Sequence, residues 1–111
     1  MMNINYTGVY LSAVACAKQM IKYKTPGAMC LVGSMSGLIA NIGFTSSVYN
    51  SSKAAVIQLG RSLAMEWGVI KEFEDVRDNS VAGSQGRKQG IRVNVLCPGN
   101  IMTPVSGRLP D

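Results

Sequence analysis

Ala28–Val32 reads AMCLV and leads directly into Gly33–Gly37, which reads GSMSG. The first five residues are all apolar and lie between turn-forming residues, a pattern typical of a strand buried on both faces in a parallel sheet. The residues that follow, as far as Ser47, are rich in Ser, Gly and Asn and predict a loop. Ile91–Cys97 (IRVNVLC) has the composition of a second strand, which Pro98–Gly99 would end. The chain therefore carries two predicted strands of a parallel sheet.

One helix is predicted before the first strand in the sequence and another after it. Residues 4–23 combine small and apolar side chains with Lys18 and Lys22 near the C-terminal end, and Lys24 follows directly. Cations at this end stabilise the helix dipole. Ser47–Trp67 places apolar or small residues on one nearly continuous helical face. The order helix, strand, loop, helix, strand is that of an α/β fold. Two strands alone leave both edges of the sheet unpaired, so we expect a fragment of a larger, doubly wound parallel sheet.

Composition excludes several classes of site. The 111 residues are 47% hydrophobic and 15% charged, against about 25% charged in a typical soluble domain, so much of the surface is expected to pack against other structure. Histidine is absent, which removes Ser-His-Asp and Cys-His catalysis and His-ligated zinc. The first carboxylate is Glu66, and Cys16, Cys30 and Cys97 lie far apart, so neither a metal site nor a disulfide framework is expected.

The charge pattern and the apolar segments indicate the surroundings of the protein. The net charge of +5 is spread over separate basic residues rather than a stripe, which argues against a nucleic-acid partner and would also suit a phosphorylated cofactor. The N-terminal residues lack the basic region of a signal peptide. Thr25–Ser52 carries no charge, but polar residues interrupt it too often for a membrane span. We expect a cytoplasmic protein without a membrane partner, and the unpaired cysteines suit a reducing compartment.

Tyr49 and Lys53 are the first candidates for catalysis. Residues four apart share one face of a helix, and a nearby ammonium stabilises a phenolate, so such a tyrosine can exchange protons. The spacing alone is equally that of an ordinary surface pair. Ser36 lies thirteen residues before Tyr49, directly after the first predicted strand, and sites in open α/β sheets form at the carboxyl ends of strands. We therefore expect Ser36 to lie beside the tyrosine.

Four features in one order resemble the short-chain dehydrogenase/reductase family. They are Asn5–Gly8 (NYTG), the serine after the strand, the Tyr49 and Lys53 pair, and Ile91–Gly99 (IRVNVLCPG). The resemblance implies a partial Rossmann-like fold, with about two strands and their flanking helices. A weaker similarity links SMSG at residues 34–37, followed by Asn41, to fungal polyol dehydrogenases and ketose reductases.

The resemblance also implies a role for each matching residue. Tyr49 would be the general acid in ketone reduction and the base in alcohol oxidation. Lys53 would favour the ionised tyrosine and bind the nicotinamide ribose, Ser36 would orient the carbonyl, and Asn5 would hold a water that links Lys53 to solvent. The expected cofactor contacts are Tyr49, Lys53, Pro98, Gly99, Ile101 and Thr103. The implied reaction is an NAD(P)-dependent interconversion of a secondary alcohol, with a sugar polyol as one candidate, and a ketone. Of the two cofactors, NADP is favoured over NAD, and a homo-oligomer would form through the two long helices.

Two departures from the family pattern lead to an alternative. Residues 1–111 would form a partial domain without the N-terminal dinucleotide-binding half, because no glycine-rich strand-turn-helix occurs. Gly68–Gln89 adds 22 residues that are rich in polar and charged side chains and lack periodicity. We expect a disordered insertion here, and a translated intron is our hypothesis for its origin. The alternative function is therefore a truncated, catalytically inactive chain that acts only by association with a full-length relative.

Overall fold

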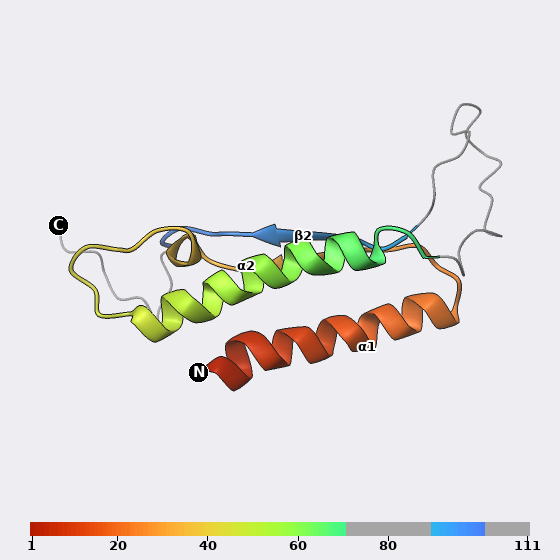
Figure 1. Cartoon of the computed structure of the whole chain (residues 1–111), viewed down its shortest axis with the longest axis horizontal. Helices are drawn as coiled ribbons and strands as arrows, with labels where there is room; N and C mark the ends of the chain where they lie inside the picture. The colour runs from red at the N-terminus through yellow and green to blue at the C-terminus, as the bar shows by residue number, and fades with distance from the viewer. Residues whose placement is uncertain (71–89, 102–111) are drawn as a thin grey trace, which may run out of the picture.

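The computed structural model describes residues 1–70 and 90–101 (Figure 1). The elements in chain order are the π-helix η1 (Asn3–Gly8), α1 (Val9–Lys22), β1 (Ala28–Val32), the 3₁₀-helix η2 (Met35–Gly37), α2 (Ser47–Trp67) and β2 (Arg92–Leu96). Both predicted helices and both predicted strands are present. Two local features differ from the expectation, since residues 3–8 wind as a π-helix and the predicted loop contains a 3₁₀ turn.

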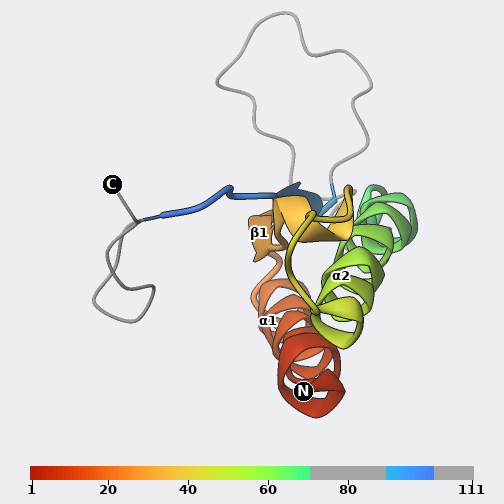
Figure 2. The same cartoon turned by 90° about the vertical axis from the view of Figure 1, so that its left-hand side faces the viewer.

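The two strands pair in parallel, as predicted. Ala28 lies opposite Arg92 and Val32 opposite Leu96, and α2 makes the crossover between the strands. Figure 2 shows both helices on the same side of the sheet. A parallel pair needs such a crossover, because the second strand must start again at the same end as the first.

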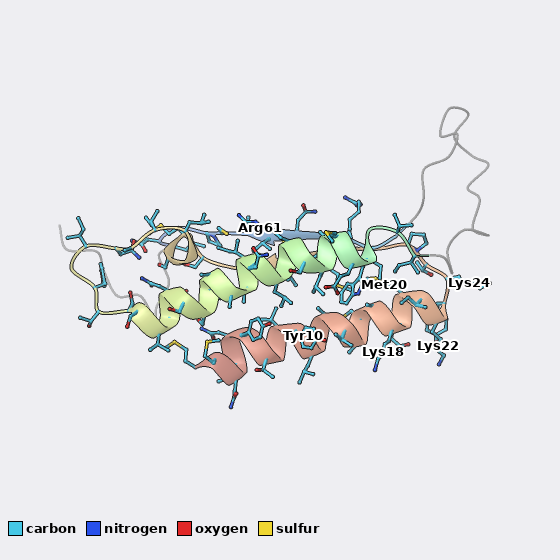
Figure 3. The ribbon with its side chains drawn as sticks, in the orientation of Figure 1. Tyr10, Lys18, Met20, Lys22, Lys24 and Arg61 are labelled. Atoms are coloured by element: carbon cyan, nitrogen blue, oxygen red, sulfur yellow. The ribbon has the colours of Figure 1, made fainter. Side chains whose placement is uncertain are left out.

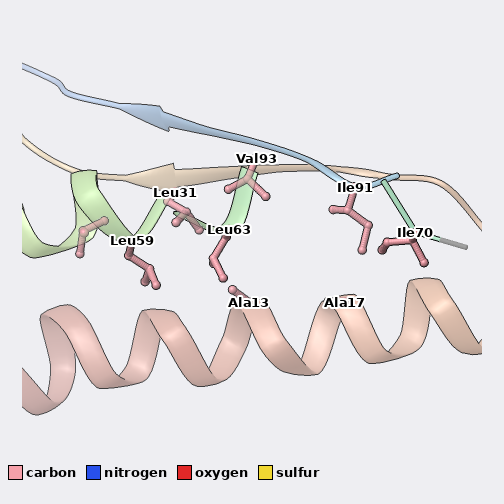
Figure 4. Packing of buried hydrophobic residues seen from close by; sticks show 9 residues of the cluster. Ala13, Ala17, Leu31, Leu59, Leu63, Ile70, Ile91 and Val93 are labelled. Atoms are coloured by element: carbon pink, nitrogen blue, oxygen red, sulfur yellow. The ribbon is translucent and has the colours of Figure 1, made fainter. Parts of the chain in front are cut away.

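The core fills the space between this face of the sheet and the two helices. Leu31 and Val93 point from the strands toward Leu59 and Leu63 of α2 (Figure 4). The buried residues that α1 contributes are Ala13 and Ala17, which are small and let the helix approach closely. The remaining members of the cluster are Val56, Ile70 and Ile91. These contacts set the distance between the helices and the sheet. They therefore also fix the position of the polar residues of α2 relative to the sheet.

Glycine is required where α2 crosses β2. A Cβ at Gly60 would collide with the side chain of Val95. The backbone of α2 therefore lies directly against the second strand, and most contacts of α2 with the sheet are with β2.

The end of α1 has a left-handed residue. Lys24 has a φ of 50°, and the N–H of Thr25 donates to the carbonyl of Met20 at 2.9 Å. Such an arrangement satisfies carbonyls that the last turn of a helix leaves unpaired. No helix in the two described segments is both long enough and apolar enough to cross a bilayer.

Candidate functional site

The loop after β1, residues 33–37, contains Ser34 and Ser36 and is here called the serine loop. It is anchored at the carboxyl edge of the sheet. After β1, the N–H of Gly33 donates to the carbonyl of Leu96 at 2.7 Å, and the N–H of Met35 donates to the carbonyl of Pro98 at 3.0 Å. Ser34 is buried and extended, and its Oγ accepts the N–H of Ser36 at 3.2 Å, which caps η2. The loop after β1 and the turn after β2 thus lie together at this edge, where open α/β sheets form their sites.

A glycine brings η2 against α2. A Cβ added at Gly37 would lie 2.7 Å from the carbonyl carbon of Lys53 and 2.7 Å from the backbone nitrogen of Ala54. Only glycine permits this approach, because both opposing atoms belong to a helix backbone. Ser36 precedes Gly37 directly, so η2 holds Ser36 beside the helical turn of Lys53. That Ser36 lies beside the Tyr49 hydroxyl stays a prediction.

The Lys53 ammonium lies between the strand end and the tyrosine. Its Nζ donates to the carbonyl oxygen of Val32 at 3.1 Å and lies 5.9 Å from the centre of the Tyr49 ring. Glu66 is the only carboxylate within residues 1–70 and 90–101, and it lies more than three helical turns further along α2. Within that part of the chain, no carboxylate competes for the charge of Lys53 near the tyrosine.

Asn5 reaches the same helix through a buried serine. The Asn5 side chain donates from Nδ2 to Ser52 Oγ at 3.1 Å, and Ser52 Oγ donates to the Tyr49 carbonyl oxygen at 2.7 Å. Ser52 is 0% exposed. Ser52 lies on the face of α2 that the sequence predicted from its apolar and small residues, and it was not predicted as a site residue. Its signal was a hydroxyl in the middle of an otherwise apolar stripe, because a buried hydroxyl needs partners.

Asn41 is a second residue whose position was not foreseen. Its Nδ2 donates to Ser36 Oγ at 2.8 Å, from the loop between η2 and α2. Ser34 lies in the segment that the sequence predicted as a loop, and it is the cap of η2. These two contacts hold the hydroxyl and the backbone of Ser36 from different directions.

The predicted cofactor contacts after β2 are described only in part. Pro98 is tied to the serine loop, and a Cβ at Gly99 would lie 3.4 Å from Met35 Sδ, so this turn borders η2. Ile101 is exposed. Thr103 lies outside the described residues. Residues 71–89, which make up most of the predicted insertion, also lie outside them.

Three lysines at and just after the end of α1 lie far from this edge. Lys18, Lys22 and Lys24 lie toward the C-terminal end of α1, at the opposite end of the long axis from η2 (Figure 3). Lys22 Nζ lies 5.4 Å from the ring centre of Tyr23. These lysines therefore belong to a separate surface and contribute no hydrogen-bond donor to the candidate site.

A groove of about 690 Å³ follows β1 and α1. All of Ala28–Val32 lines it, together with Asn5 and Lys53. Because five consecutive strand residues form one wall, we interpret this groove as the open edge of the sheet rather than as a ligand pocket. Asn5 and Lys53 line this groove and also belong to the candidate site.

The comparisons with known proteins cover nearly the whole chain. The family model for short chain dehydrogenase matches residues 1–111. The chain is 47% identical over 102 residues to the short chain dehydrogenases/reductase notP' of Aspergillus versicolor, covering 92% of this chain and 30% of that protein. It is 38% identical over 106 residues to the D-arabinitol 2-dehydrogenase [ribulose-forming] of Candida albicans (strain WO-1), covering 96% and 31%. The chain thus spans about a third of the length of these relatives.

A solved structure agrees with this assignment. A 4-hydroxyisoleucine dehydrogenase complexed with NADH superposes with a TM-score of 0.68 at 28% identity, covering 95% of this chain and 37% of that one. The match confirms the predicted fold class, a partial Rossmann-like parallel sheet with flanking helices. From its sequence and its fold together, the chain belongs to the short chain dehydrogenase family.

Proposed function

We propose that this chain provides the proton-transfer part of an NAD(P)-dependent oxidoreductase that interconverts a secondary alcohol and a ketone. The observation that supports it best is Lys53, which is hydrogen-bonded to the end of β1 beside the Tyr49 ring, on the turn where η2 packs. Similar proteins are named for oxidation of D-arabinitol and galactitol and for reduction of L-xylulose. We therefore propose a sugar polyol and its ketose as the substrate pair.

Each candidate residue has a distinct task in this proposal. Tyr49 gives a proton to the carbonyl oxygen during reduction and takes it back during oxidation. Lys53 binds the nicotinamide ribose beside Tyr49, and Ser36 donates a hydrogen bond to the same substrate oxygen. Asn5 supports the tyrosine turn through Ser52 in addition to the water-holding role that the family resemblance implies.

The residues present fit the nicotinamide end of a dinucleotide. The Lys53 ammonium offers donors for ribose hydroxyls, and no described carboxylate lies near it to compete. The turn that contains Pro98 and Gly99 borders the serine loop, and we propose that it contacts the cofactor together with Ile101 and Thr103. When bound, the nicotinamide would supply hydride transfer. The net charge of +5 favours NADP, whereas one similar reductase is named NADH-dependent.

The test is turnover of D-arabinitol with NAD⁺ and NADP⁺, and of D-ribulose with the reduced forms. Tyr49→Phe removes the hydroxyl that moves the proton and is expected to lower kcat by about 10² to 10⁴-fold. Tyr10→Phe is the matched control, because Tyr10 is exposed on α1, and it should leave kcat unchanged. A chain that turns over these substrates equally well with Tyr49→Phe would refute the proposed roles.

The alternative is an inactive chain that associates with a full-length relative. The open edge of β1 and the groove beside it favour this alternative, because an unpaired strand can add to another sheet. Binding of a full-length relative without turnover or dinucleotide binding would support it. Three further predictions are a homo-oligomer through α1 and α2 in the full-length protein, a partial domain, and a cytoplasmic location.

A further inference from the structure

The hydroxyl of Ser36 is held by a side chain to which no role has been given. Asn41 Nδ2 donates to Ser36 Oγ at 2.8 Å, and the backbone N–H of Ser36 donates to Ser34 Oγ at 3.2 Å. Ser36 and Asn41 are half-buried, and Ser34 is buried. The serine is therefore fixed at two points, one on its backbone and one on its side chain.

The direction of the Asn41 hydrogen bond matters chemically. A hydroxyl has one hydrogen and two lone pairs, and a donor that approaches the oxygen uses one lone pair and leaves the hydrogen uncommitted. Among the hydrogen bonds of residues 1–70 and 90–101, Ser36 Oγ accepts from Asn41 and donates to no protein atom. An acceptor at position 41 would instead capture the hydrogen that a substrate oxygen needs.

In the loop around Asn41 the apolar side chains are exposed and the polar one is partly buried, the reverse of a normal surface loop. Asn41 is the only polar side chain between Leu38 and Phe44, yet it is less exposed than the apolar residues on either side of it. Leu38 is 61% exposed and Ile42 is 100% exposed. A polar side chain that is less exposed than its apolar neighbours and is hydrogen-bonded to Ser36 ties this loop to η2.

We propose that Asn41 is a positioning residue, which holds Ser36 Oγ as an acceptor so that the hydroxyl hydrogen stays available to the substrate oxygen. The catalytic meaning of this contact rests on the proposed function, whereas the contact itself does not. Asn41 does not touch the reacting atoms in this proposal. It acts only through the orientation of Ser36.

The first test needs no catalytic activity. Asn41→Asp keeps the size of the side chain and replaces the donor by an acceptor, which should take the Ser36 hydrogen. A hydrogen bond to the ionised form lowers the pKa of a carboxylate. The pKa of the introduced carboxylate, followed by carbon NMR in the full chain, should therefore be lower in Asn41→Asp than in the double variant Asn41→Asp with Ser36→Ala. Equal pKa values in the two variants would overturn the proposal.

The second test is kinetic and uses D-ribulose with NADH and NADPH. Asn41→Asp should lower kcat by about tenfold or more, the rate equivalent of roughly one misdirected hydrogen bond, with less effect on KM. Asn41→Ala should lower kcat less, because it removes the clamp without capturing the hydrogen. Asn94→Asp, which introduces the same charge on an exposed position of β2, should leave kcat unchanged. Equal losses of kcat for Asn41→Asp and Asn41→Ala would overturn the positioning role. An inactive parent chain would instead refute the proposed function, and the carboxylate titration would then be the test of the contact between Asn41 and Ser36.

Discussion

Ser52 shows how one buried hydroxyl can organise a site. It is 0% exposed and accepts from Asn5 while it donates to the carbonyl of Tyr49. The acceptance joins the π-helix η1 to α2, and the donation holds the turn from which the tyrosine projects. Irregular π segments often occur at functional sites. Asn5 belongs to the π-helix of residues 3–8, and its hydrogen bond joins that helix to a residue 47 positions later in the sequence.

Replacement of this hydroxyl gives a prediction at the residue scale. Ser52→Ala leaves the Asn5 amide without its serine partner, and we expect the free energy of unfolding to fall by about 1 to 3 kcal/mol. Urea denaturation monitored by circular dichroism measures the change. Ser51→Ala is the matched control, because Ser51 is the exposed neighbour on the same helix, and its effect should be within about 0.5 kcal/mol of zero. Equal effects of the two variants would contradict the link.

At the scale of elements, the predicted bounds of β1 and α2 agree with the structure, and the irregular segments were not foreseen. The apolar run at residues 28–32 and the helical period of Ser47–Trp67 are local signals, so sequence alone reveals them. The 3₁₀ turn at Met35–Gly37 was not predicted, because its position depends on packing against α2. Likewise, the spacing from Ser36 to Tyr49 indicated that the two share a site, but no sequence signal gave the bond from Asn41, because that bond depends on how the loop folds back.

The contact between η2 and α2 carries the prediction at this scale. Gly37→Ala places a Cβ within 2.7 Å of two backbone atoms of α2, so η2 must move away from the turn of Lys53. We expect a loss of about 1 to 3 kcal/mol in the free energy of unfolding and a larger fractional loss of turnover. Denaturation and kinetics on the same preparation measure both effects.

A second glycine variant separates strain from displacement. Gly43 has a φ of +84° and nothing within 4 Å of an added Cβ, so Gly43→Ala strains the backbone without a collision. Its stability loss should be about 1 kcal/mol. Turnover of folded Gly43→Ala should remain unchanged. A similar loss of turnover in both variants would show that the close approach of η2 is not what positions the serine.

At the scale of the whole molecule, the described part is a two-stranded sheet with helices on one side only (Figure 2). The other side of the sheet exposes apolar side chains, including Val32 and Leu96, each more than half exposed. The low content of charged residues, 15%, had suggested that much of the surface packs against other structure. The uncovered sheet face and the groove beside β1 are the places where such packing would occur.

This arrangement predicts that the chain self-associates through its sheet. Unpaired strand edges template pairing with other chains, and lysine on an edge strand is a common protection against it. Cys30→Lys introduces a charge at the middle of β1, at an exposed position away from the Lys53 contact, and should shift the chain toward monomer in sedimentation velocity over a concentration series. Met65→Lys is the matched variant on α2, where the side chain is 87% exposed. If Met65→Lys rather than Cys30→Lys favours the monomer, association occurs through the helices and the open sheet is not the contact.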